Sequence, residues 1–520
     1  MSTVMARKFQ ESPMSNQISK TETDLNYCSD KKMPVPPTGP EAKPLPKMTL
    51  DGKIVEFVPG DTIMQAAERV GKASQIPRYC YHPGLSIAGT CRMCTVEVEK
   101  APKLMTACST PAADGMVVHT RSEKVLKSRS GVLDCLLANH PLDCPVCDKA
   151  GECELQDYDY EYGPRSSSFA EEKRVFPKSS TRHFSEKIVF NMNRCVACER
   201  CVRFTDEITK TNDLVMLNRG RKKELTVGDE QKGLYNDYQG CLSDFCPVGA
   251  LTWTDFRFQK RVWFLRHDPS ICDGCAKGCN IEVHSEKEII YRYAPIYNAK
   301  VNGHWICDEG RLSYKMVMNP NRIIAPLVDV MGHGPVATTW EAVVPFVAST
   351  LKSSSKVLLV VGTDATQEEC ESLKKFLTRL SPSLEIRYFN GTGVKTSAEN
   401  KPLDHLLRQS DKTPNTKGVE SLGIKPLDSG AISGFDTVIV FRNGRAGIPS
   451  IASAKNVILW GVFSLEEVKA LKNVKALMPG LATQEKSGTF VNSDGLAQSF
   501  NRAVVHRGFG LEVARIVEKF

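Results

Sequence analysis

The distribution of cysteines constrains this chain more than any other feature. Nineteen cysteines occur in 520 residues, and eighteen of them lie at or before Cys307, which leaves Cys370 alone in the C-terminal part. A disulfide framework suits small secreted domains, but the N-terminus (Met1–Gln10) lacks the apolar core of a signal peptide. No stretch approaches the roughly 18–20 apolar residues that span a bilayer. Clustered cysteines in such a chain more often bind metal.

Length and local patterns predict several domains, since single cores rarely exceed about 250–300 residues. The net charge of +8 is mixed in sign, and the short basic run 219–223 indicates a solvated loop rather than a nucleic-acid site. Residues 47–60 predict a β-hairpin around Asp51-Gly52, and a helix is expected over Asp61–Val70 with Asp61 as its N-cap. Later strand candidates are Arg261–Leu265, Val357–Val361, Thr437–Phe441 and Val457–Trp460.

The first candidate ligand set is Cys80, Cys91, Cys94 and Cys108, spaced C-x10-C-x2-C-x13-C. Four thiolates can hold a [2Fe–2S] cluster, and glycines in the loop let backbone N–H groups approach the sulfurs. The plant-type spacing is C-x4-C-x2-C, so this set is a variant of it. The preceding hairpin and helix favour a β-grasp ferredoxin-like domain over the alternative, a structural zinc site.

The second set is His140, Cys144, Cys147 and Cys153, spaced H-x3-C-x2-C-x5-C. Replacing a thiolate by a neutral imidazole makes the ligand set one unit less negative, which favours the reduced state of a cluster. Zinc would suit this motif taken alone. Its position directly after a ferredoxin-like domain favours [4Fe–4S].

The third set is the triad Cys195, Cys198 and Cys201 with a remote fourth ligand. Three cysteines at this spacing wrap three corners of a cubane, and a proline usually follows the fourth cysteine of such a run. Cys246 is followed by Pro247, whereas the competing Cys241 is not, so we assign Cys246. Only one such triad is present, and one [4Fe–4S] cluster is expected.

The fourth set is Cys272, Cys275, Cys279 and Cys307, spaced C-x2-C-x3-C-x27-C. Zinc is a serious rival on spacing alone. The three other sets favour a further [4Fe–4S] cluster. Four cysteines remain outside the sets and are expected to be structural or exposed thiols: Cys28, Cys135, Cys241 and Cys370.

These ordered sets resemble a known family. The motifs CRMCTVEVE, HPLDCPVCDKAGECELQD, RCVACERCVRF and CPVGALT are similar to those of the large, G-type iron–sulfur subunit of bacterial NADH:quinone oxidoreductase, respiratory complex I. The resemblance is strongest over 47–255. It implies one [2Fe–2S] and two [4Fe–4S] clusters on the residues named above, which pass electrons from the flavin-bearing NADH-oxidising subunit towards the quinone-reducing arm.

Two further likenesses concern the rest of the chain. The fourth set is similar to an extra [4Fe–4S] cluster of some bacterial members and to the first domain of molybdopterin-dependent formate dehydrogenases, which implies a place off the main electron route. The segment Ala476–Gln498 resembles the end of a molybdopterin-oxidoreductase body. About 200 residues after the fourth set are too few for a full body, so we expect a truncated remnant without molybdopterin.

The expected fold class is therefore multidomain α+β. The expected segments are a proline-rich extended or disordered arm (1–46), a β-grasp [2Fe–2S] ferredoxin-like domain (47–124), a His/Cys [4Fe–4S] domain (125–165), a ferredoxin-like [4Fe–4S] domain (166–260), a molybdoenzyme-type [4Fe–4S] domain (261–320) and a truncated molybdopterin-oxidoreductase-like α/β region (321–520).

The function expected from this likeness is electron transfer within the complex. No G-x-G-x-x-G fingerprint follows a strand, so no NADH or flavin site is expected on this chain, and none for quinone. Expected partners are the other complex I subunits, notably the flavin-bearing subunit and the cluster-bearing connecting subunits, on the cytoplasmic side of the bacterial inner membrane. Nucleic acid and a membrane span are not expected.

Three other classes of protein share parts of this pattern. An iron-only hydrogenase needs a second ferredoxin triad and a later cysteine set, and a single cysteine after Cys307 excludes it. A formate dehydrogenase catalytic subunit would need a longer C-terminal body, and the diaphorase small subunit of NAD-linked hydrogenases is usually shorter. A zinc-stabilised scaffold is the remaining alternative.

Overall fold

The structure is a computed structural model that forms two compact units. One comprises Met1–Arg78 and Arg92–Ser128, and the other Tyr79–Cys91 and Arg129–Phe520. The described residues are 44–71, 75–164, 166–176, 181–329, 334–381, 383–391, 394–428, 432–451, 453–506 and 508–520. Most of the predicted N-terminal arm, including Cys28, lies outside them. Among the helices that are described, none has the length and apolar character needed to cross a membrane.

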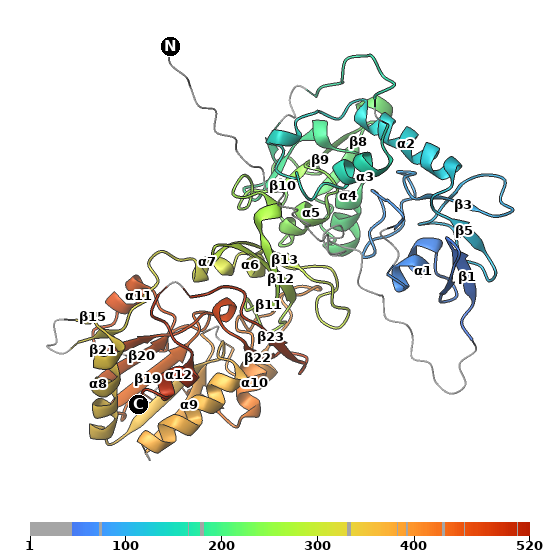
Figure 1. The fold of residues 1–520 in the computed structure, drawn as a ribbon. Coiled ribbons are helices and arrows are strands. Elements are labelled where there is room, and N and C mark those ends of the chain that lie inside the picture. The colour runs from blue at the N-terminus through green and yellow to red at the C-terminus, as the bar shows by residue number, and fades with distance from the viewer. Residues whose placement is uncertain are drawn as a thin grey trace, which may run out of the picture. The chain divides into compact units, whose positions relative to one another are not determined.

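The first unit is built on a five-stranded sheet in the order β2-β1-β5-β3-β4 (Figure 1). Its strands are β1 (Lys47–Leu50), β2 (Lys53–Glu56), β3 (Thr95–Val98), β4 (Met105–Thr106) and β5 (Val117–His119). The predicted hairpin is confirmed, since β1 and β2 are antiparallel around a turn in which Asp51 and Gly52 have φ values of 46° and 79°. Asp-Gly suits such a turn because both residues tolerate positive φ. Strand β1 also pairs with β5 in parallel.

Helix α1 (Ile63–Arg69) lies where a helix was expected, but its N-cap differs. Thr62 is the N-cap, with a capping box to Gln65, so the expectation of Asp61 was wrong. The carboxylate of Asp61 instead accepts hydrogen bonds from the Val58 N–H and from the Arg69 guanidinium (Nε–Oδ2 2.6 Å). Asp61 thus ties the end of α1 to the loop before it.

Short elements connect the cysteine-rich part of the second unit. The helices are α2 (Glu123–Leu137, which begins in the first unit), α3 (Glu154–Tyr162), α4 (Arg200–Arg203), α5 (Gln239–Phe245), α6 (Asp308–Arg311) and α7 (Tyr314–Val317). The strands are β6 (Arg182–His183), β7 (Ile188–Phe190), β8 (Leu214–Leu217), β9 (Glu224–Val227) and β10 (Leu251–Trp253). Strands β10, β7 and β6 form one small sheet, and β8 pairs with β9.

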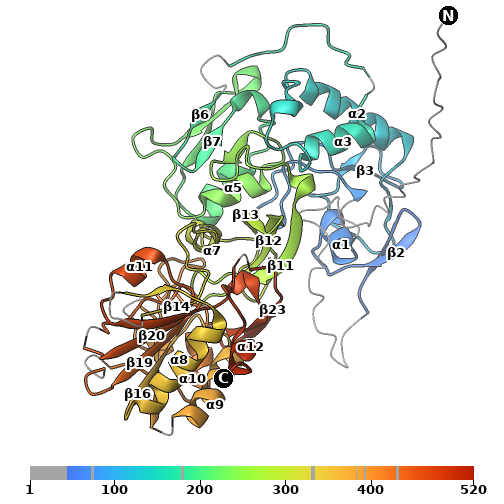
Figure 2. The same cartoon turned by 60° about the vertical axis from the view of Figure 1, so that its left-hand side comes forward.

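An antiparallel sheet follows in the order β11-β12-β13 (Figure 2). Its strands are β11 (Arg266–Ile271), β12 (Asn280–Glu286) and β13 (Ile289–Pro295). The predicted strand at Arg261–Leu265 was wrong, because Val262–Phe264 form a single 3-10 turn whose aromatic residues are exposed. Alternation of polar and apolar residues over five positions does not distinguish such a turn from a strand.

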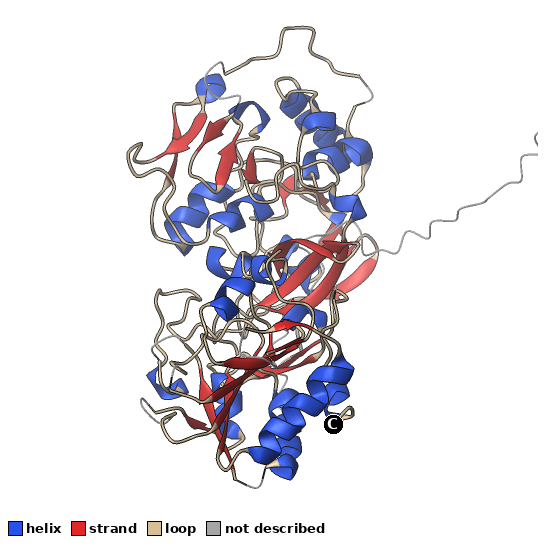
Figure 3. Ribbon diagram, turned by 90° about the vertical axis from the view of Figure 1, so that its left-hand side faces the viewer, coloured by secondary structure: helices blue, strands red, loops and turns tan. Residues whose placement is uncertain are grey.

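The C-terminal part is an eight-stranded sheet covered on both faces (Figures 1 and 3). The strand order is β15-β14-β21-β20-β19-β16-β17-β18. The strands are β14 (Leu327–Val328), β15 (Val336–Ala337), β16 (Val357–Gly362), β17 (Leu384–Phe389), β18 (Lys425–Pro426), β19 (Thr437–Arg442), β20 (Asn456–Gly461) and β21 (Val474–Pro479). The three predicted buried strands are confirmed as β16, β19 and β20. Burial on both faces explains their continuous apolar sequences.

Two apolar cores hold this sheet between its helices. Helices α8 (Trp340–Ser353), α9 (Gln367–Leu380) and α12 (Val513–Val517) pack on the face that includes Leu359 and Trp460. Helix α11 (Leu465–Lys469) packs on the other face, against Leu358 and Leu459. Helix α10 (Thr416–Ser421) and the β22–β23 hairpin (Gly488–Val491, Ala497–Phe500) complete the region. The expected multidomain mixture of α and β structure is confirmed.

Candidate iron–sulfur cluster sites

The third set lines one cavity. Cys195, Cys198, Cys201 and Cys246 all line it, and the rest of the lining is largely apolar, with Met216, Leu225, Val248 and Leu251. The elements that bring these cysteines together are short: Cys195 ends a 3-10 turn, Cys201 lies in α4 and Cys246 is the C-cap of α5. The backbone N–H of Ala197 points at Sγ of Cys195, at 3.3 Å. Four sulfurs with an apolar lining fit a cubane cluster.

The backbone of this triad is strained. Ala197 and Glu199, which each lie between two cysteines of the triad, both have positive φ values, 52° and 60°. A left-handed conformation costs a non-glycine residue about 1–2 kcal/mol, and such conformations persist where the surroundings impose them. The strain turns the three sulfurs of the triad towards one cavity.

Burial keeps cysteines of this set in the neutral thiol form in the chain alone. Burial raises the pKa of Cys195 and of Cys198 to about 12, and neighbouring cysteines add to the shift. The thiolates of these two residues are therefore unfavourable unless a cation neutralises them. The donor chemistry fits a bound metal group rather than an ordinary apolar core.

Cys241, the competing fourth ligand, has another partner. Its thiol donates to the carbonyl oxygen of Ile306 (3.2 Å), and it does not line the cavity. Of the other cysteines outside the sets, Cys370 is buried among the apolar side chains around α9, and Cys135 is exposed. This arrangement supports Cys246 as the fourth ligand.

The second set surrounds the start of α3. Cys144 begins a 3-10 turn that ends at Cys147, and Cys153 is the N-cap of α3. Backbone N–H groups of Leu155 and Gln156 face the Cys153 sulfur and partly offset the burial that raises its pKa to about 12. A helix N-terminus suits a thiolate because its free N–H groups point at the negative charge.

His140 is in the state that a ligand needs. Burial, with smaller effects of Arg194 and Lys173, lowers its pKa to about 4, although Asp143 acts in the opposite direction. The imidazole is therefore neutral at pH 7 and keeps a lone pair for a metal. Arg194 and Asp143, which are ion-paired (2.5 Å), also act on Cys147. The two candidate ligands thus share the same neighbours.

The second and third sets are interlocked through their backbones. The N–H of Glu154, next to Cys153, donates to the carbonyl of Pro247, next to Cys246 (3.0 Å). Gly249 lies so close to the second set that an added Cβ would be 2.2 Å from Sγ of Cys147. The ligand loops of the two sets are therefore in direct contact.

Two buried cations lie at this junction. Lys149, between Cys147 and Cys153, donates to the carbonyl of Ser243 (3.0 Å) and pairs with Glu152 (3.4 Å). Burial opposes its charge, but Glu152 and Cys246 outweigh burial and raise its pKa. Arg200 pairs with Glu154 (3.0 Å) and donates to the carbonyl of Phe245 (2.9 Å).

The cysteines of the fourth set lie at the ends of three elements, close to two glycines. Cys272 follows β11, Cys279 precedes β12 and Cys307 is the N-cap of α6. Backbone N–H groups point at two of the sulfurs, Gly274 at Cys272 (3.4 Å) and Gly310 at Cys307 (3.3 Å). A Cβ on Gly310 would be 2.9 Å from Sγ of Cys272. Four buried cysteines with backbone N–H groups aimed at two of the sulfurs fit a cluster.

Residues of the C-terminal part make hydrogen bonds to the loop that carries the fourth set. The Ala276 N–H donates to the carbonyl of Asp411 (3.0 Å), and the Ala276 carbonyl accepts from Ser493 N–H (2.7 Å). Gln498 Nε2 and Arg445 Nη2 donate to the carbonyls of Gly278 and Gly274 (2.9 and 3.2 Å). The loop is thus an anchor of the C-terminal part, which suits a structural role for this set.

The first set is described as two separate pairs. Cys94 and Cys108 flank β3 and β4 of the first unit, where the Ala107 N–H donates to the Cys94 carbonyl (3.0 Å). Cys80 and Cys91 belong to the second unit, and hydrogen bonding to Cys80 is the main cause of the raised pKa of Cys91. There the Arg203 guanidinium donates to the carbonyl of Cys80 (2.5 Å).

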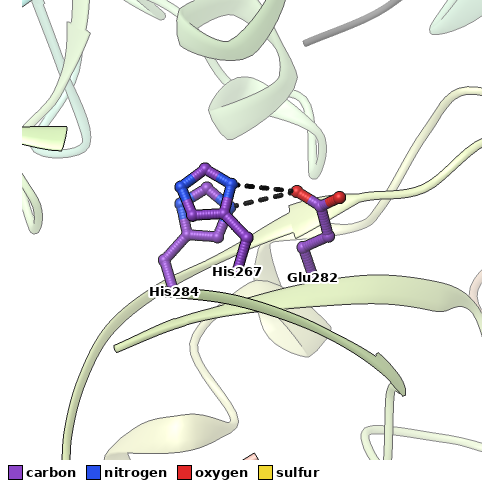
Figure 4. Close-up of side chains that lie close together, drawn as sticks. All are labelled: His267, Glu282 and His284. Atoms are coloured by element: carbon purple, nitrogen blue, oxygen red, sulfur yellow. Dashed lines mark hydrogen bonds and ion pairs between the residues drawn. The ribbon is translucent and has the colours of Figure 1, made fainter. Parts of the chain in front are cut away.

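Two histidines and a glutamate outside the four sets lie close enough to bind a metal, but their side chains are engaged in hydrogen bonds. His267 and His284 stack at 3.9 Å and both face one carboxylate oxygen of Glu282 (Figure 4). Arg292 Nε donates to Nδ1 of His284 (3.0 Å), so the proton of the neutral ring lies on Nε2, which faces Glu282. Both ring nitrogens of His284 are thus engaged, Nδ1 as an acceptor and Nε2 as a donor, and neither has a lone pair left for a metal. We assign no metal here.

Sequence reasoning missed the residues that join the second and third sets. Lys149, Arg200 and Gly249 all lie inside or beside the cysteine motifs. A basic residue between two ligands was a usable signal of a tuning charge. Which set it faces depends on tertiary contacts that the spacing does not contain.

Four family models match consecutive parts of the chain. They are the 2Fe-2S iron-sulfur cluster binding domain (residues 47–123), the NADH-ubiquinone oxidoreductase-G iron-sulfur binding region (129–168), the ferredoxin-like domain of NADH-quinone oxidoreductase subunit 3 (185–252) and the molybdopterin oxidoreductase Fe4S4 domain (265–319). The chain is therefore an iron–sulfur protein with one domain of the 2Fe–2S type and several of the 4Fe–4S type.

Curated relatives that match about two thirds of the chain agree with these family models. The G subunit of NADH-quinone oxidoreductase from Rickettsia bellii is 38% identical over 336 residues, which are 64% of this chain and 48% of that protein. The NADH-ubiquinone oxidoreductase 75 kDa subunit of Reclinomonas americana is 38% identical over 365 residues, 70% of this chain and 52% of that protein. The chain belongs to the family of NADH-quinone oxidoreductase G subunits. It spans about half the length of the curated relatives it matches.

A solved chain also matches. It comes from the crystal structure of NAD+-reducing [NiFe]-hydrogenase in the H2-reduced state, with 30% identity over 42% of this chain and 91% of that chain. The TM-score of 0.37 is too low to support a statement about the fold.

Proposed function

We propose that this chain is an electron-transfer subunit of an NADH:quinone oxidoreductase. It would hold one [2Fe–2S] cluster on Cys80, Cys91, Cys94 and Cys108. Three [4Fe–4S] clusters would be held by the second set (His140, Cys144, Cys147, Cys153), the third set (Cys195, Cys198, Cys201, Cys246) and the fourth set (Cys272, Cys275, Cys279, Cys307). When bound, such clusters supply reversible one-electron redox chemistry.

The contact between the second and third ligand loops carries this proposal. The hydrogen bond from Glu154 to Pro247 and the packing of Gly249 on Cys147 hold two four-ligand sets next to each other. Two isolated structural metal sites would not need this contact. Adjacent redox sites do, because electron transfer depends on a short and fixed separation.

The residues around the sets then have a clear task. They keep water out, since the third set is lined by apolar side chains, and they donate backbone N–H groups to sulfurs. Hydrogen bonds to the ligands and burial are the means by which a protein tunes such centres. The fourth set, gripped by the C-terminal part, would contribute mainly to stability.

The proposed partners are a flavin-bearing subunit that oxidises NADH and cluster-bearing subunits that lead to quinone. The proposed location is the cytoplasmic side of a bacterial inner membrane, as a peripheral subunit. These assignments rest on the family, because the relatives are named for that reaction.

Reduction by NADH with and without the flavin-bearing partner tests the proposal. The anaerobic holoprotein should not be reduced by NADH alone, whereas adding catalytic amounts of the flavin subunit should bleach its visible absorbance and produce EPR signals of reduced clusters. Reduction by NADH without the partner, or no reduction with it, would refute the proposed relay.

A further inference from the structure

Two buried cations lie against the C-terminus of the helix that carries the fourth ligand of the third set. Helix α5 ends at Phe245, and Cys246 is its C-cap. Lys149 Nζ lies 3.0 Å from the carbonyl oxygen of Ser243 and 3.5 Å from that of Asp244. Arg200 Nη1 lies 2.9 Å from the carbonyl oxygen of Phe245. The last three carbonyls before Cys246 therefore all face a positive charge.

The two cations come from different ligand loops. Arg200 belongs to the triad of the third set itself, whereas Lys149 lies between two ligands of the second set, Cys147 and Cys153. Lys149 is thus a side chain of one candidate cluster site that contacts the backbone holding the other. No surface residue could do this, and the side chain of Lys149 is only 8% exposed.

A chain of ion pairs fixes the position of Lys149. Its ammonium group pairs with Glu152 (3.4 Å), and Glu152 receives Nη1 and Nη2 of Arg292 (3.2 and 2.6 Å). Arg292 is held in turn by His284 (3.0 Å) and by stacking on Phe256 (4.2 Å). The charge of Lys149 is therefore held at one place rather than on a mobile stem.

The sign of the electrostatic effect follows from this position. A helix C-terminus carries partial negative charge, and four thiolates add to it, so both oppose the further negative charge of reduction. A buried cation at the same carbonyls acts through a low dielectric and favours the reduced form. It should raise the reduction potential of the group that the third set holds.

We propose that Lys149 is a positioning residue for electron exchange between the second and third sets: it ties the second loop to the turn that carries Cys246, and its charge raises the reduction potential at the third set. This inference rests on the proposed function. One electron moves between the two sets, no bond is made or broken, and Lys149 keeps its proton throughout.

Redox titration of the full-length holoprotein, followed by EPR, tests the role of Lys149. Lys149→Met and Lys149→Gln should lower the reduction potential of the third-set cluster. Lys149→Arg keeps the positive charge and should keep the potential close to that of wild type. The matched control is Lys232→Met, which removes an exposed lysine that pairs with Asp229 (3.8 Å) and should leave the potential unchanged.

The outcomes separate this inference from the proposed function. If Lys149→Met does not assemble, the other two variants still test the role of Lys149. The third-set potential should then be highest in wild type, lower in Lys149→Arg and lowest in Lys149→Gln. Equal potentials in Lys149→Arg and Lys149→Gln, or a shift as large in Lys232→Met, would overturn the role of Lys149 while leaving the clusters in place. Wild-type protein without iron–sulfur signals would instead overturn the proposed function.

Discussion

Gly249 is the position at which one methyl group should remove one cluster. A Cβ there would lie 2.2 Å from Sγ of Cys147 and 3.3 Å from Cβ of Lys149. Cβ atoms essentially never approach other atoms within 3.0 Å, so the sulfur or the loop must move by about 0.8 Å. Overpacking of this kind costs about 1–3 kcal/mol. The same shift would misplace a ligand sulfur whose bond to a metal is only about 2.3 Å long.

Gly249→Ala should therefore lose the second cluster selectively. We expect about four of about 14 irons per chain to be missing, since the second set would hold one [4Fe–4S] cluster of the proposed four. Iron and sulfide analysis with EPR of the reduced protein measures this. The matched control is Gly131→Ala in α2, where an added Cβ meets nothing within 4 Å and alanine favours the helix.

Full iron content together with an unchanged melting temperature in Gly249→Ala would refute the reasoning. It would mean that the second and third loops are not packed as the structure has them. Loss of all clusters in both Gly249→Ala and Gly131→Ala would also contradict it, because the effect would then not depend on Cys147.

Three further predictions concern single positions. His140→Cys should retain a cluster at the second set but lower its potential, because a thiolate adds negative charge; iron content and redox titration both unchanged would exclude His140 as a ligand. Cys275→Ser should remove about four irons while turnover of the assembled complex stays largely intact, and loss of turnover with assembly preserved would place the fourth set on the route. Burial and Arg292 lower the pKa of His284 to about 3, below the 6.5 of a free histidine. The stability that its neutral ring contributes is thus complete above pH 6.5 and is lost as pH falls towards 3, so the melting temperature should fall in that window and fall less in His284→Gln.

Most of what could be predicted about the sites came from the spacing of the candidate ligands. The triad and the proline after Cys246 distinguished that residue from Cys241, because a cubane needs its ligands in a tight loop and a chain that then turns away. The structure adds that Cys241 has its own acceptor, the carbonyl of Ile306. The ligand sets themselves stay predictions.

Local structure was less predictable where two residues compete for one role. Asp61 and Thr62 both suit an N-cap, and only the tertiary contact of Asp61 with Arg69 decides between them. The buried strands of the C-terminal sheet were predictable, since β16 is apolar throughout. Neither the strand order nor the role of Lys149 could be read from the sequence, because both depend on pairings between distant segments.

Anaerobic EPR of the fully reduced protein, with iron, sulfide and zinc analysis of the same sample, tests the central claim most directly. It counts the clusters and separates a [2Fe–2S] centre from cubanes. The account predicts about 14 irons per chain, one [2Fe–2S] signal and signals of [4Fe–4S] type from the other sets. About four zinc ions per chain with no iron–sulfur signal would contradict it and would leave a zinc-stabilised scaffold in its place.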